Sequence, residues 1–416
     1  MREIKRWRRV GQWGIKPLIC SLVVVTAVAG CKQPTEGGTA SGGNGTGGSN
    51  GTDASSVGKA AAYTGDDILL GEYGSLTGST ATFGISSDNG MQMAVDEVNG
   101  AGGVLGKKVR VQKEDDGGKS EQVGSVIKKL INQDNVLAIV GEVASSRSIA
   151  AAPICQAAGV PMITPASTNP TVTTIGDDIF RTCFTDTFQG AVGARFAGKN
   201  LKAKTAAVLT DVANDYSKGL GAAFIEEFQK NGGKIVAQES YSEHDTDFHA
   251  QLTRIKSTNP DVIFIPGYYT EAATIAVQAR SLGIQQPLLG GDGWDSRELI
   301  KIGKSALQNC YFSDHYSPDS PDPKVKQFVT TYQKRFGEIP DAMAPLAYDA
   351  THLLLDAIKR AGSLDRDKIR DAIANTKNYP GVTGNISIDK DRNAVKPITI
   401  LQVKGDKFTA FTTIKP

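Results

Sequence analysis

The chain has 416 residues, of which 40% are hydrophobic and 22% are charged. This is the composition of an ordinary globular protein, and the length exceeds what one hydrophobic core usually organises, so we expect two lobes. The formal net charge of +2 conceals an asymmetry, because residues 1–30 carry six Lys or Arg and a single Glu. From Cys31 onward 40 basic side chains face 43 acidic ones, a net charge of −3, which argues against a nucleic-acid partner.

The first thirty residues have the layout of a secretory signal peptide. A basic stretch ends at Lys16, and the apolar run PLICSLVVVTAVAG that follows is too short to remain as a spanning helix. The run closes with VAGC, whose cysteine is Cys31, and this quartet resembles the lipobox of bacterial lipoproteins. The resemblance implies cleavage before Cys31 and several acyl chains on it, which anchor a protein stably where one chain is marginal. The alternative is an ordinary signal peptide that happens to end near a cysteine.

Residues 31–65 are rich in Gly, Ser, Thr and Asn and contain almost no large apolar side chain. Such a segment cannot bury enough surface to order itself, so we predict a flexible tether. Gly43, Gly45 and Gly48 match the spacing G-x-G-x-x-G, but no strand precedes them. We therefore interpret them as a chance match and not as a dinucleotide site.

From Asp66 onward strand and helix patterns alternate almost without interruption. Runs typical of strands lie at 68–76, 107–115, 136–143, 160–164, 178–183, 204–211, 234–241, 261–267, 287–293 and 309–316. Amphipathic stretches lie between them at 88–103, 121–133, 217–233, 247–258 and 270–283, and several end at Gly, as helices tend to. This alternation predicts βαβ units and parallel sheets of the α/β class.

The βα pattern repeats before and after about residue 186, which predicts two doubly wound, Rossmann-like lobes joined by a hinge. Near the end the pattern changes to consecutive helices at 323–337, 343–362 and 365–375, and then to short strands at 384–389, 398–404 and 408–414. Helices that arrive late with no strand between them indicate that the chain returns to cover the first lobe. The expected boundaries are 66–186 and 318–390 for lobe 1, and 187–317 and 391–416 for lobe 2.

Two strand ends carry small hydroxyl residues. The strand at 160–164 is followed by Ala166, Ser167 and Thr168, and another strand gives way to a helix that should begin near Ser145. Ligands of open α/β sheets bind beyond the carboxyl ends of the strands, and a helix N-terminus offers free N–H donors to a carboxylate. The pattern favours a site for a small anion, although a simple N-cap and a simple turn explain the same residues.

Other chemical patterns are weaker. The stretch GGKS at 117–120 ends like a phosphate loop, but Lys113 stands where that motif needs a glycine. His244 and His249 lie five residues apart in a polar loop and would not share a helical face well as metal ligands. His315 and His352 have no recognisable nucleophile nearby, and G-x-S-x-G is absent. We therefore expect no metal, no cofactor and no enzymatic activity.

The chain contains five cysteines. Cys20 leaves with the signal peptide and Cys31 is the expected anchor. In an oxidising compartment Cys155 and Cys183 are candidates for a disulfide, with Cys310 left as a buried thiol, although spacing alone does not establish the pairing.

Eight short stretches follow one another at specific spacings. They are GSLTGSTATFG (74–84), AVDEVNGAGGVLGKKV (94–109), GEVASS (141–146), PMITPASTNPTVT (161–173), FRTCFTDTFQG (180–190), DYSKGL (215–220), PGYYTEAA (266–273) and GGDGWDS (290–296). Together they resemble the type I periplasmic binding proteins of ABC importers, especially the leucine/isoleucine/valine-binding branch, over nearly all of residues 66–416. The resemblance implies two lobes that close over a small ligand.

The same resemblance implies a role for each site residue. Positions matching Ser145, Ala166 and Thr168 hold the α-carboxylate of an amino acid, and those matching Tyr268 and Asp292 receive its α-ammonium. Aromatic positions of the side-chain pocket match Phe83 and Tyr216, and we add Trp294 only because it lies two residues after Asp292.

Two residues depart from the family pattern. Arg147 follows the double serine where the branch has a small polar residue, which leaves an acidic or larger ligand open. Asp292 replaces a longer Glu, which shifts the acceptor by about one methylene. The class of ligand is therefore better indicated than its member.

The resemblance implies an exported lipoprotein at the periplasm or cell surface that captures a small, branched-chain or other apolar amino acid and passes it to an ABC permease. We expect a monomer whose contact with the membrane is the lipid anchor. A receptor that reports amino acids or amides to a signalling partner is the alternative, and an enzyme on a similar scaffold is a third interpretation.

Overall fold

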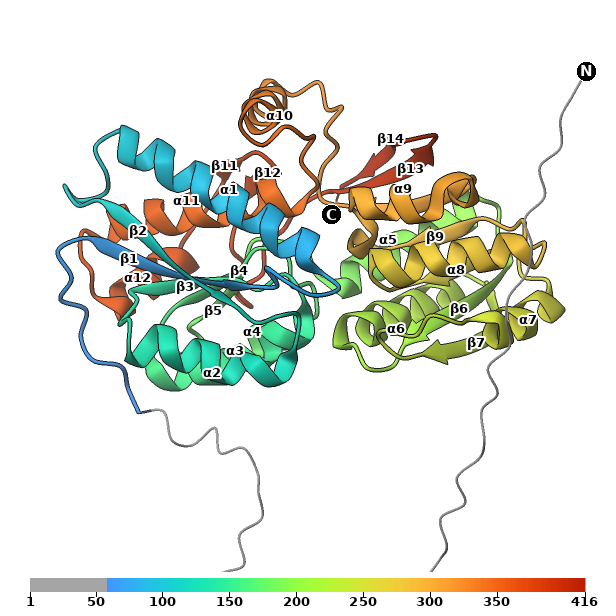
Figure 1. Cartoon of the computed structure of the whole chain (residues 1–416), viewed down its shortest axis with the longest axis horizontal. Coiled ribbons are helices and arrows are strands. Elements are labelled where there is room, and N and C mark those ends of the chain that lie inside the picture. The colour runs from blue at the N-terminus through green and yellow to red at the C-terminus, as the bar shows by residue number, and fades with distance from the viewer. Residues whose placement is uncertain (1–57, 416) are drawn as a thin grey trace, which may run out of the picture. The chain divides into compact units, whose positions relative to one another are not determined.

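A computed structural model describes residues 58–415, and the first of its two large sheets has five parallel strands in the order β2-β1-β3-β4-β5 (Figure 1). These strands are β1 (Ile68–Gly74), β2 (Val109–Asp115), β3 (Ala138–Val140), β4 (Met162–Thr164) and β5 (Ile179–Arg181). Strands β3, β4 and β5 have three residues each, and all of these residues are buried because helices cover both faces of the sheet.

Helices from both ends of the described chain cover this first sheet. They are α1 (Ala81–Gly100), α2 (Ser120–Asn132), α3 (Ser145–Ala158), α4 (Thr171–Thr174), α11 (Met343–Ala361) and α12 (Arg366–Ala374). Successive strand residues point to opposite faces, so Val140 packs with α1, α11 and α12, whereas Ile139 packs with α2 and α3. The late helices α11 and α12 therefore cover the first sheet.

Helix α10 (Pro323–Phe336) forms an outer layer over α1 and α11 (Figure 1). Its Phe328 and Tyr332 pack against Met93 of α1 and Ala344 of α11. Asp322 caps its N-terminus by accepting a hydrogen bond from Lys324 N–H at 2.8 Å, and Pro323 occupies the first turn, where its missing N–H has no consequence.

The second sheet has seven strands in the order β14-β13-β10-β9-β8-β6-β7. Parallel strands are β6 (Thr205–Asp211), β7 (Lys234–Tyr241), β8 (Val262–Ile265), β9 (Leu288–Gly290) and β10 (Cys310–Asp314). The antiparallel edge consists of β13 (Ile398–Lys404) and β14 (Lys407–Ile414). Around it lie α5 (Asp186–Lys199), α6 (Asp215–Lys230), α7 (His249–Thr258), α8 (Tyr269–Ser281), α9 (Arg297–Gly303) and the 3-10 helices η2 (Asp292–Trp294) and η3 (Lys304–Leu307).

The chain passes between the two sheets three times. The first crossing follows β5, the second follows β10, and the third precedes β13. A small hairpin of β11 (Tyr379–Gly381) and β12 (Gly384–Ile386) lies shortly before the third crossing. The observed architecture is thus the expected pair of doubly wound α/β sheets.

Two helices differ from the sequence prediction. Helix α1 begins at Ala81 rather than near Asp88, because its first turns, although rich in small and polar residues, bury Phe83 and Ser86. Helix α5 was not predicted, because small residues interrupt its apolar stripe. Gly190 explains the pattern: a side chain there would collide with Ala223 of α6, so the two helices need this glycine to pack closely.

The predicted N-terminal segments lie largely outside the described residues. This holds for the signal peptide, for Cys31 and for most of the tether. The chain is already packed before Asp66, since Ala60 N–H donates to Ala158 O at 2.9 Å and the Tyr63 hydroxyl donates to Asp67 O at 2.6 Å. Across residues 58–415, none of the helices combines the length and apolar character of a membrane span.

Candidate ligand-binding site

A small cavity lies between the elements of the two sheets. Its lining comprises Phe83, Val143, Ser145, Ala166, Thr168, Tyr216, Tyr268, Asp292, Gly293 and Met343. Seven of the eight ligand-binding residues predicted from the sequence therefore meet at one place, although they come from segments spread over more than two hundred positions. The carboxyl ends of the strands converge there, as expected for open α/β sheets.

Ser145 opens helix α3 directly beyond the loop that follows β3. The N-cap position belongs to Ala144, so the Ser145 side chain does not cap the helix. Its hydroxyl oxygen instead accepts a hydrogen bond from Asn169 N–H at 3.1 Å, which ties the start of α3 to the loop after β4. The first N–H groups of this 14-residue helix lie at the same edge and carry its partial positive charge.

Side chains of the loop after β4 point either into the cavity or away from it. Ser167 points away from the cavity, since its hydroxyl lies 2.9 Å from Glu142 O and 3.0 Å from Val143 O. Ala166 and Thr168, on either side of it, line the cavity. The Thr168 hydroxyl is buried and makes no hydrogen bond within the described residues. A buried hydroxyl without a partner costs free energy, so this group is available to a ligand.

Asp292 supplies the acidic side chain of the cavity from the second sheet. It lies in η2 just after β9 and is only 3% exposed. Its Oδ1 accepts hydrogen bonds from Gln189 Nε2 at 2.8 Å and from the Tyr216 hydroxyl at 2.9 Å. Its Oδ2 lies 2.9 Å from His315 Nε2. The carboxylate is thus fixed by three side chains from α5, α6 and the second crossing.

Aromatic rings form one wall of the cavity. The rings of Tyr216 and Tyr268 stack with an interplanar angle of 1° and a centroid separation of 5.3 Å. Phe83 of α1 meets Tyr268 edge to face at 5.8 Å. With Val143 and Met343, these rings give the cavity an apolar part between its hydroxyl edge and its acidic edge.

Asp186 is a functional candidate that sequence reasoning missed. It begins α5, is fully buried, and neither carboxyl oxygen has a hydrogen-bond partner within the described residues. Burial raises the pKa of Asp186 well above its usual range, the nearby Thr168 hydroxyl lowers it, and the Asp292 charge raises it further. These influences together favour the protonated form of Asp186, which lies near the Asp292 carboxylate.

His315 and Gln189 were also missed. His315 was set aside because no nucleophile was near it in the sequence, yet it lies just beyond the carboxyl end of β10. The rule that drew attention to Ser145 and Thr168 applies equally to this strand end and could have identified it. Gln189 lies in a helix whose pattern the sequence did not reveal, so no comparable signal pointed to it.

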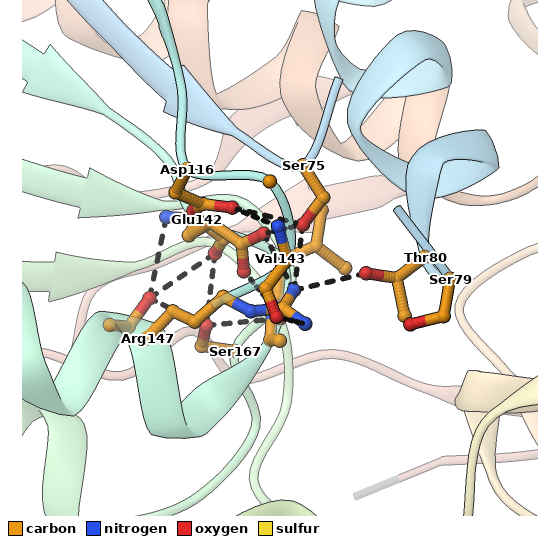
Figure 2. Close-up of polar contacts among 12 residues, drawn as sticks. Ser75, Ser79, Thr80, Asp116, Glu142, Val143, Arg147 and Ser167 are labelled. Carbon is orange, nitrogen blue, oxygen red and sulfur yellow. Dashed lines mark hydrogen bonds and ion pairs between the residues drawn. The ribbon is translucent and has the colours of Figure 1, made fainter. Parts of the chain in front are cut away.

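Arg147 does not line the cavity. Its guanidinium contacts Glu142 Oε1 at 3.0 Å, Ser75 Oγ at 2.8 Å and Thr80 Oγ1 at 3.1 Å (Figure 2). It also donates to Gly118 O at 2.9 Å. Because Glu142 already balances its charge in a buried network, Arg147 is not free to bind an acidic ligand, an option that the sequence had left open.

Trp294 corrects one sequence prediction. It is completely buried beneath the site, does not line the cavity, and its indole N–H donates to Ile265 O at 3.0 Å. The tight turn of η2 directs Asp292 into the cavity and sends the side chain two residues later into the core. Proximity in the sequence was therefore a poor guide.

The predicted disulfide is a second correction. Among the residues that the structure describes, Cys155, Cys183 and Cys310 are all buried free thiols. Cys155 packs in the core between α2, α3 and the first sheet, whereas the Cys183 thiol faces Ser167 O at 3.3 Å in the first crossing. The two side chains occupy separate parts of the core, and their spacing along the sequence could not show this.

Contacts across the cavity join elements of the two sheets. Asp215 N–H donates to Ser146 Oγ at 2.9 Å, and Asn169 Nδ2 donates to Asp215 O at 2.8 Å. On another side the Tyr269 hydroxyl donates to Ser79 O at 2.8 Å. These bonds require that the elements around the two sheets meet, so the structure has the cavity closed.

The lining suits a small zwitterion, because it combines hydroxyl and N–H donors from the loops of the first sheet, a carboxylate from the second sheet, and apolar side chains. A profile of the periplasmic binding protein family matches residues 68–407. The chain belongs to the periplasmic binding protein family. Its members are solute-binding proteins and not enzymes.

The relatives of this periplasmic binding protein include amino-acid binders. The Leu/Ile/Val-binding protein BraC3 of Rhizobium johnstonii is 34% identical over 77% of this chain and 87% of its own length. The solved leucine-binding protein LivK of Thermotoga maritima is 42% identical with a TM-score of 0.81, over 84% of this chain and 99% of that chain.

Two further solved structures hold different ligands. The branched-chain amino acid transporter substrate-binding protein LivJ of Streptococcus pneumoniae, in complex with isoleucine, is 37% identical with a TM-score of 0.80, over 84% of this chain and 100% of that chain. A solute-binding protein of an ABC transporter from Rhodopseudomonas palustris, in complex with 3,4-dihydroxybenzoic acid, is 28% identical with a TM-score of 0.77, over 84% of this chain and 98% of that chain. Amino acids and aromatic acids are therefore the ligand classes to separate.

Proposed function

We propose that this periplasmic binding protein captures a branched-chain or other small apolar amino acid and delivers it to an ABC importer. The observation that carries the proposal is the pairing of opposite polarities across one cavity. Thr168 offers a buried hydroxyl without a partner, and Asp292 offers a buried carboxylate, on elements of different sheets. An α-amino acid carries a carboxylate and an ammonium on neighbouring atoms and can satisfy both.

In this proposal the α-carboxylate lies against Ser145, the Ala166 N–H and Thr168, near the N-terminus of α3. The α-ammonium lies against Asp292, with Tyr268 beside it. Each charge-assisted hydrogen bond contributes about 1.5–3 kcal/mol net in such a dry site. The ligand side chain faces Phe83, Tyr216 and the other apolar residues of the lining, which favours an aliphatic group of modest size.

Asp292 also favours amino acids over aromatic acids. A benzoate-type ligand has no cation, so it would leave the Asp292 carboxylate buried without a counter-charge. An uncompensated buried charge costs about 3–5 kcal/mol, which is a large part of the free energy of binding of a small ligand. We therefore expect the site to reject ligands of the dihydroxybenzoate type.

Closure links binding to transport in this proposal. We assign the first sheet with its helices to one lobe and the second sheet with its helices to the other, joined by the three crossings. A ligand that bridges the lobes stabilises the closed form, and a preference of about 5.5 kcal/mol shifts a 1:99 equilibrium to 99:1. The permease then recognises the closed shape. We further propose that the protein acts as a monomer, held to the membrane through acylated Cys31 in the periplasm or at the cell surface.

Calorimetry on the purified protein, freed of bound ligand by unfolding and refolding, tests the proposal. L-Leucine, L-isoleucine and L-valine form one set of probes, and benzoate and 3,4-dihydroxybenzoate form the other. We expect binding within the first set and none in the second. Tight binding of an aromatic acid without binding of any amino acid would refute the proposed function.

A further inference from the structure

Within residues 58–415, the Asp292 carboxylate is held by three groups that all have neutral forms. Gln189 and Tyr216 donate to Oδ1 at 2.8 and 2.9 Å, and His315 Nε2 lies 2.9 Å from Oδ2. Neither Lys nor Arg is among these hydrogen-bond donors. A fixed cation in this place would cancel the charge that an ammonium ligand needs, whereas a neutral donor orients the carboxylate and leaves its charge intact.

His315 is held rigidly in the second crossing. Its ring stacks on Phe184 of the first crossing, with 3.8 Å between centroids and an interplanar angle of 15°. Its side chain is completely buried, and its backbone N–H donates to Asp314 Oδ1 at 2.7 Å. The ring therefore has little freedom to turn away from Asp292.

The second ring nitrogen shows which form of His315 fits the site. Nδ1 is buried and makes no hydrogen bond within the described residues. A proton on Nδ1 would be a buried donor without an acceptor, so the tautomer with its proton on Nε2, donated to Asp292, is favoured. Burial lowers the pKa of His315 below its ordinary value, while the Asp292 hydrogen bond and charge act to raise it and Lys396 lowers it.

We propose that His315 is a positioning residue that holds Asp292 as a neutral donor, and that a proton on His315 and the ammonium of a ligand compete for the same carboxylate charge. This inference rests on the proposed function, since it requires a ligand that carries an ammonium group. Binding at low pH must then release the proton from His315. The affinity for an amino acid accordingly rises with pH until His315 is neutral in the free protein.

The other charged groups around the ring do not remove this competition. Burial raises the pKa of Asp186 and of Asp314 well above the usual range, which favours the neutral, protonated form of each. Burial lowers the pKa of Lys396, in the third crossing, to about 8, and its ammonium contacts the Thr383 hydroxyl. Arg181 donates to the backbone oxygens of Ser167 and Asn169. Asp292 is thus the charge that the His315 ring meets directly.

The test compares wild type with His315→Gln and His315→Phe by calorimetry with L-leucine between pH 4.5 and pH 8. For wild type we expect affinity to fall up to about tenfold per pH unit below the pKa of His315, with proton release on binding in buffers of different ionisation enthalpy. Glutamine can donate to Asp292 but does not titrate in this range. His315→Gln should therefore bind within about threefold of wild type at pH 7.5 and lose both the slope and the proton release.

Phenylalanine keeps a ring to stack on Phe184 but lacks the donor, so His315→Phe should bind at least about tenfold more weakly at every pH. If His315→Phe does not fold, His315→Gln still decides the question. A wild-type slope that persists in His315→Gln overturns the inference and leaves the proposed function standing. Absence of amino-acid binding by wild type at any pH overturns the proposed function itself.

Discussion

The Tyr216 hydroxyl donates to Asp292 Oδ1 at 2.9 Å and accepts a hydrogen bond from Gly293 N–H at 3.1 Å. One phenol thus ties the acidic side chain to the backbone of its own turn. The same ring stacks on Tyr268, so the aromatic wall and the carboxylate of the cavity form one rigid unit. The position of Asp292 is consequently fixed before a ligand arrives, which reduces the entropic cost of binding.

Asp292→Asn should weaken L-leucine binding by at least about tenfold and up to about 150-fold, the equivalent of about 1.5–3 kcal/mol. The substitution removes the charge that faces the ammonium but preserves the size of the side chain. Calorimetry with L-leucine and with 4-methylpentanoate, which is leucine without its amino group, separates the effects. In Asp292→Asn the affinities for leucine and for 4-methylpentanoate should lie closer together than in wild type. An unchanged preference for leucine would contradict the role given to Asp292.

Thr168→Val should weaken L-leucine binding by about tenfold while leaving the stability of the free protein unchanged or higher. The reason is that the Thr168 hydroxyl makes no well-formed hydrogen bond within the described residues and only lies near the Asp186 carboxyl, so its removal costs the empty protein little. Calorimetry and urea unfolding of the same samples give the two quantities.

Ser167→Ala provides the matched control for Thr168→Val. The Ser167 hydroxyl is bonded to backbone oxygens of the loop after β3, so its loss should lower the free energy of unfolding by about 1–2 kcal/mol. Binding at a ligand concentration that saturates the folded protein should persist. The assignment would be wrong if Thr168→Val lost stability but kept binding while Ser167→Ala lost binding but kept stability.

Much of the fold was predictable because its signals are local. Buried parallel strands read as continuous apolar runs, and helices that end in glycine mark their own boundaries, so the alternation of strand and helix and the late helices were evident. Helix α5 was not predictable, because its small residues are needed for contact with α6. That contact is a tertiary one and leaves no local pattern in the sequence. The start of α1 was missed for a similar reason, since Phe83 is buried by elements of the cavity and not by its own helical stripe.

The site was predictable where a strand end or a family resemblance pointed to it. Ser145, Thr168 and Asp292 satisfy both conditions and line the cavity. Trp294 had only proximity in its favour and lies in the core. His315 lies at a strand end, so the same rule could have pointed to it, but its contact with Asp292 is with a residue 23 positions away. Asp186 gains its importance from Thr168 and Asp292, and a single sequence contains no sign of such contacts.

Gly291→Ala should weaken amino-acid binding at least about tenfold. A Cβ at this position would lie 2.3 Å from the Tyr216 hydroxyl oxygen, so the tyrosine must move and release Asp292. Displacement of a side chain in a packed site costs about 1–3 kcal/mol. Calorimetry with L-leucine measures the effect.

Gly198→Ala is the control for the glycine substitution. A Cβ on Gly198 in α5 meets no atom within 4 Å, so alanine should raise the free energy of unfolding by about 0.5–1 kcal/mol and leave binding unchanged. Equal binding losses in both variants would indicate a general effect of removing glycine and not a collision in the site.

Cys31→Ser should release the protein from the membrane fraction of producing cells. Serine offers no thiol for the diacylglyceryl group, and the remaining chain then lacks the anchor that several acyl chains provide. Fractionation followed by immunoblotting checks this, with Cys310→Ser as the control because Cys310 is buried in the second sheet. Continued membrane association of the Cys31→Ser protein would contradict the proposed lipid anchor.

Asp116 should make the protein less stable as the pH rises from about 4 to about 7.5. Burial, and then the Glu142 charge, raise the pKa of Asp116 to about 7, whereas its ordinary value is 3.8. Between these two values the folded state keeps a proton that the unfolded state has lost. The stabilisation is complete below the unfolded pKa and is lost as the pH passes the folded one, on the order of 4 kcal/mol in all. Urea unfolding at several pH values should show a shallower decline for Asp116→Asn, since asparagine stays neutral and keeps an oxygen to accept from Gly118 N–H. For the neighbouring Asp115, burial acts to raise the pKa, but hydrogen bonds from Thr77 and other groups lower it below its ordinary value of 3.8. The stabilisation from Asp115 is therefore lost only at lower pH, and Asp115→Asn should leave the decline towards pH 7.5 unchanged as a control. A decline that is identical in wild type and Asp116→Asn would exclude Asp116 as its source.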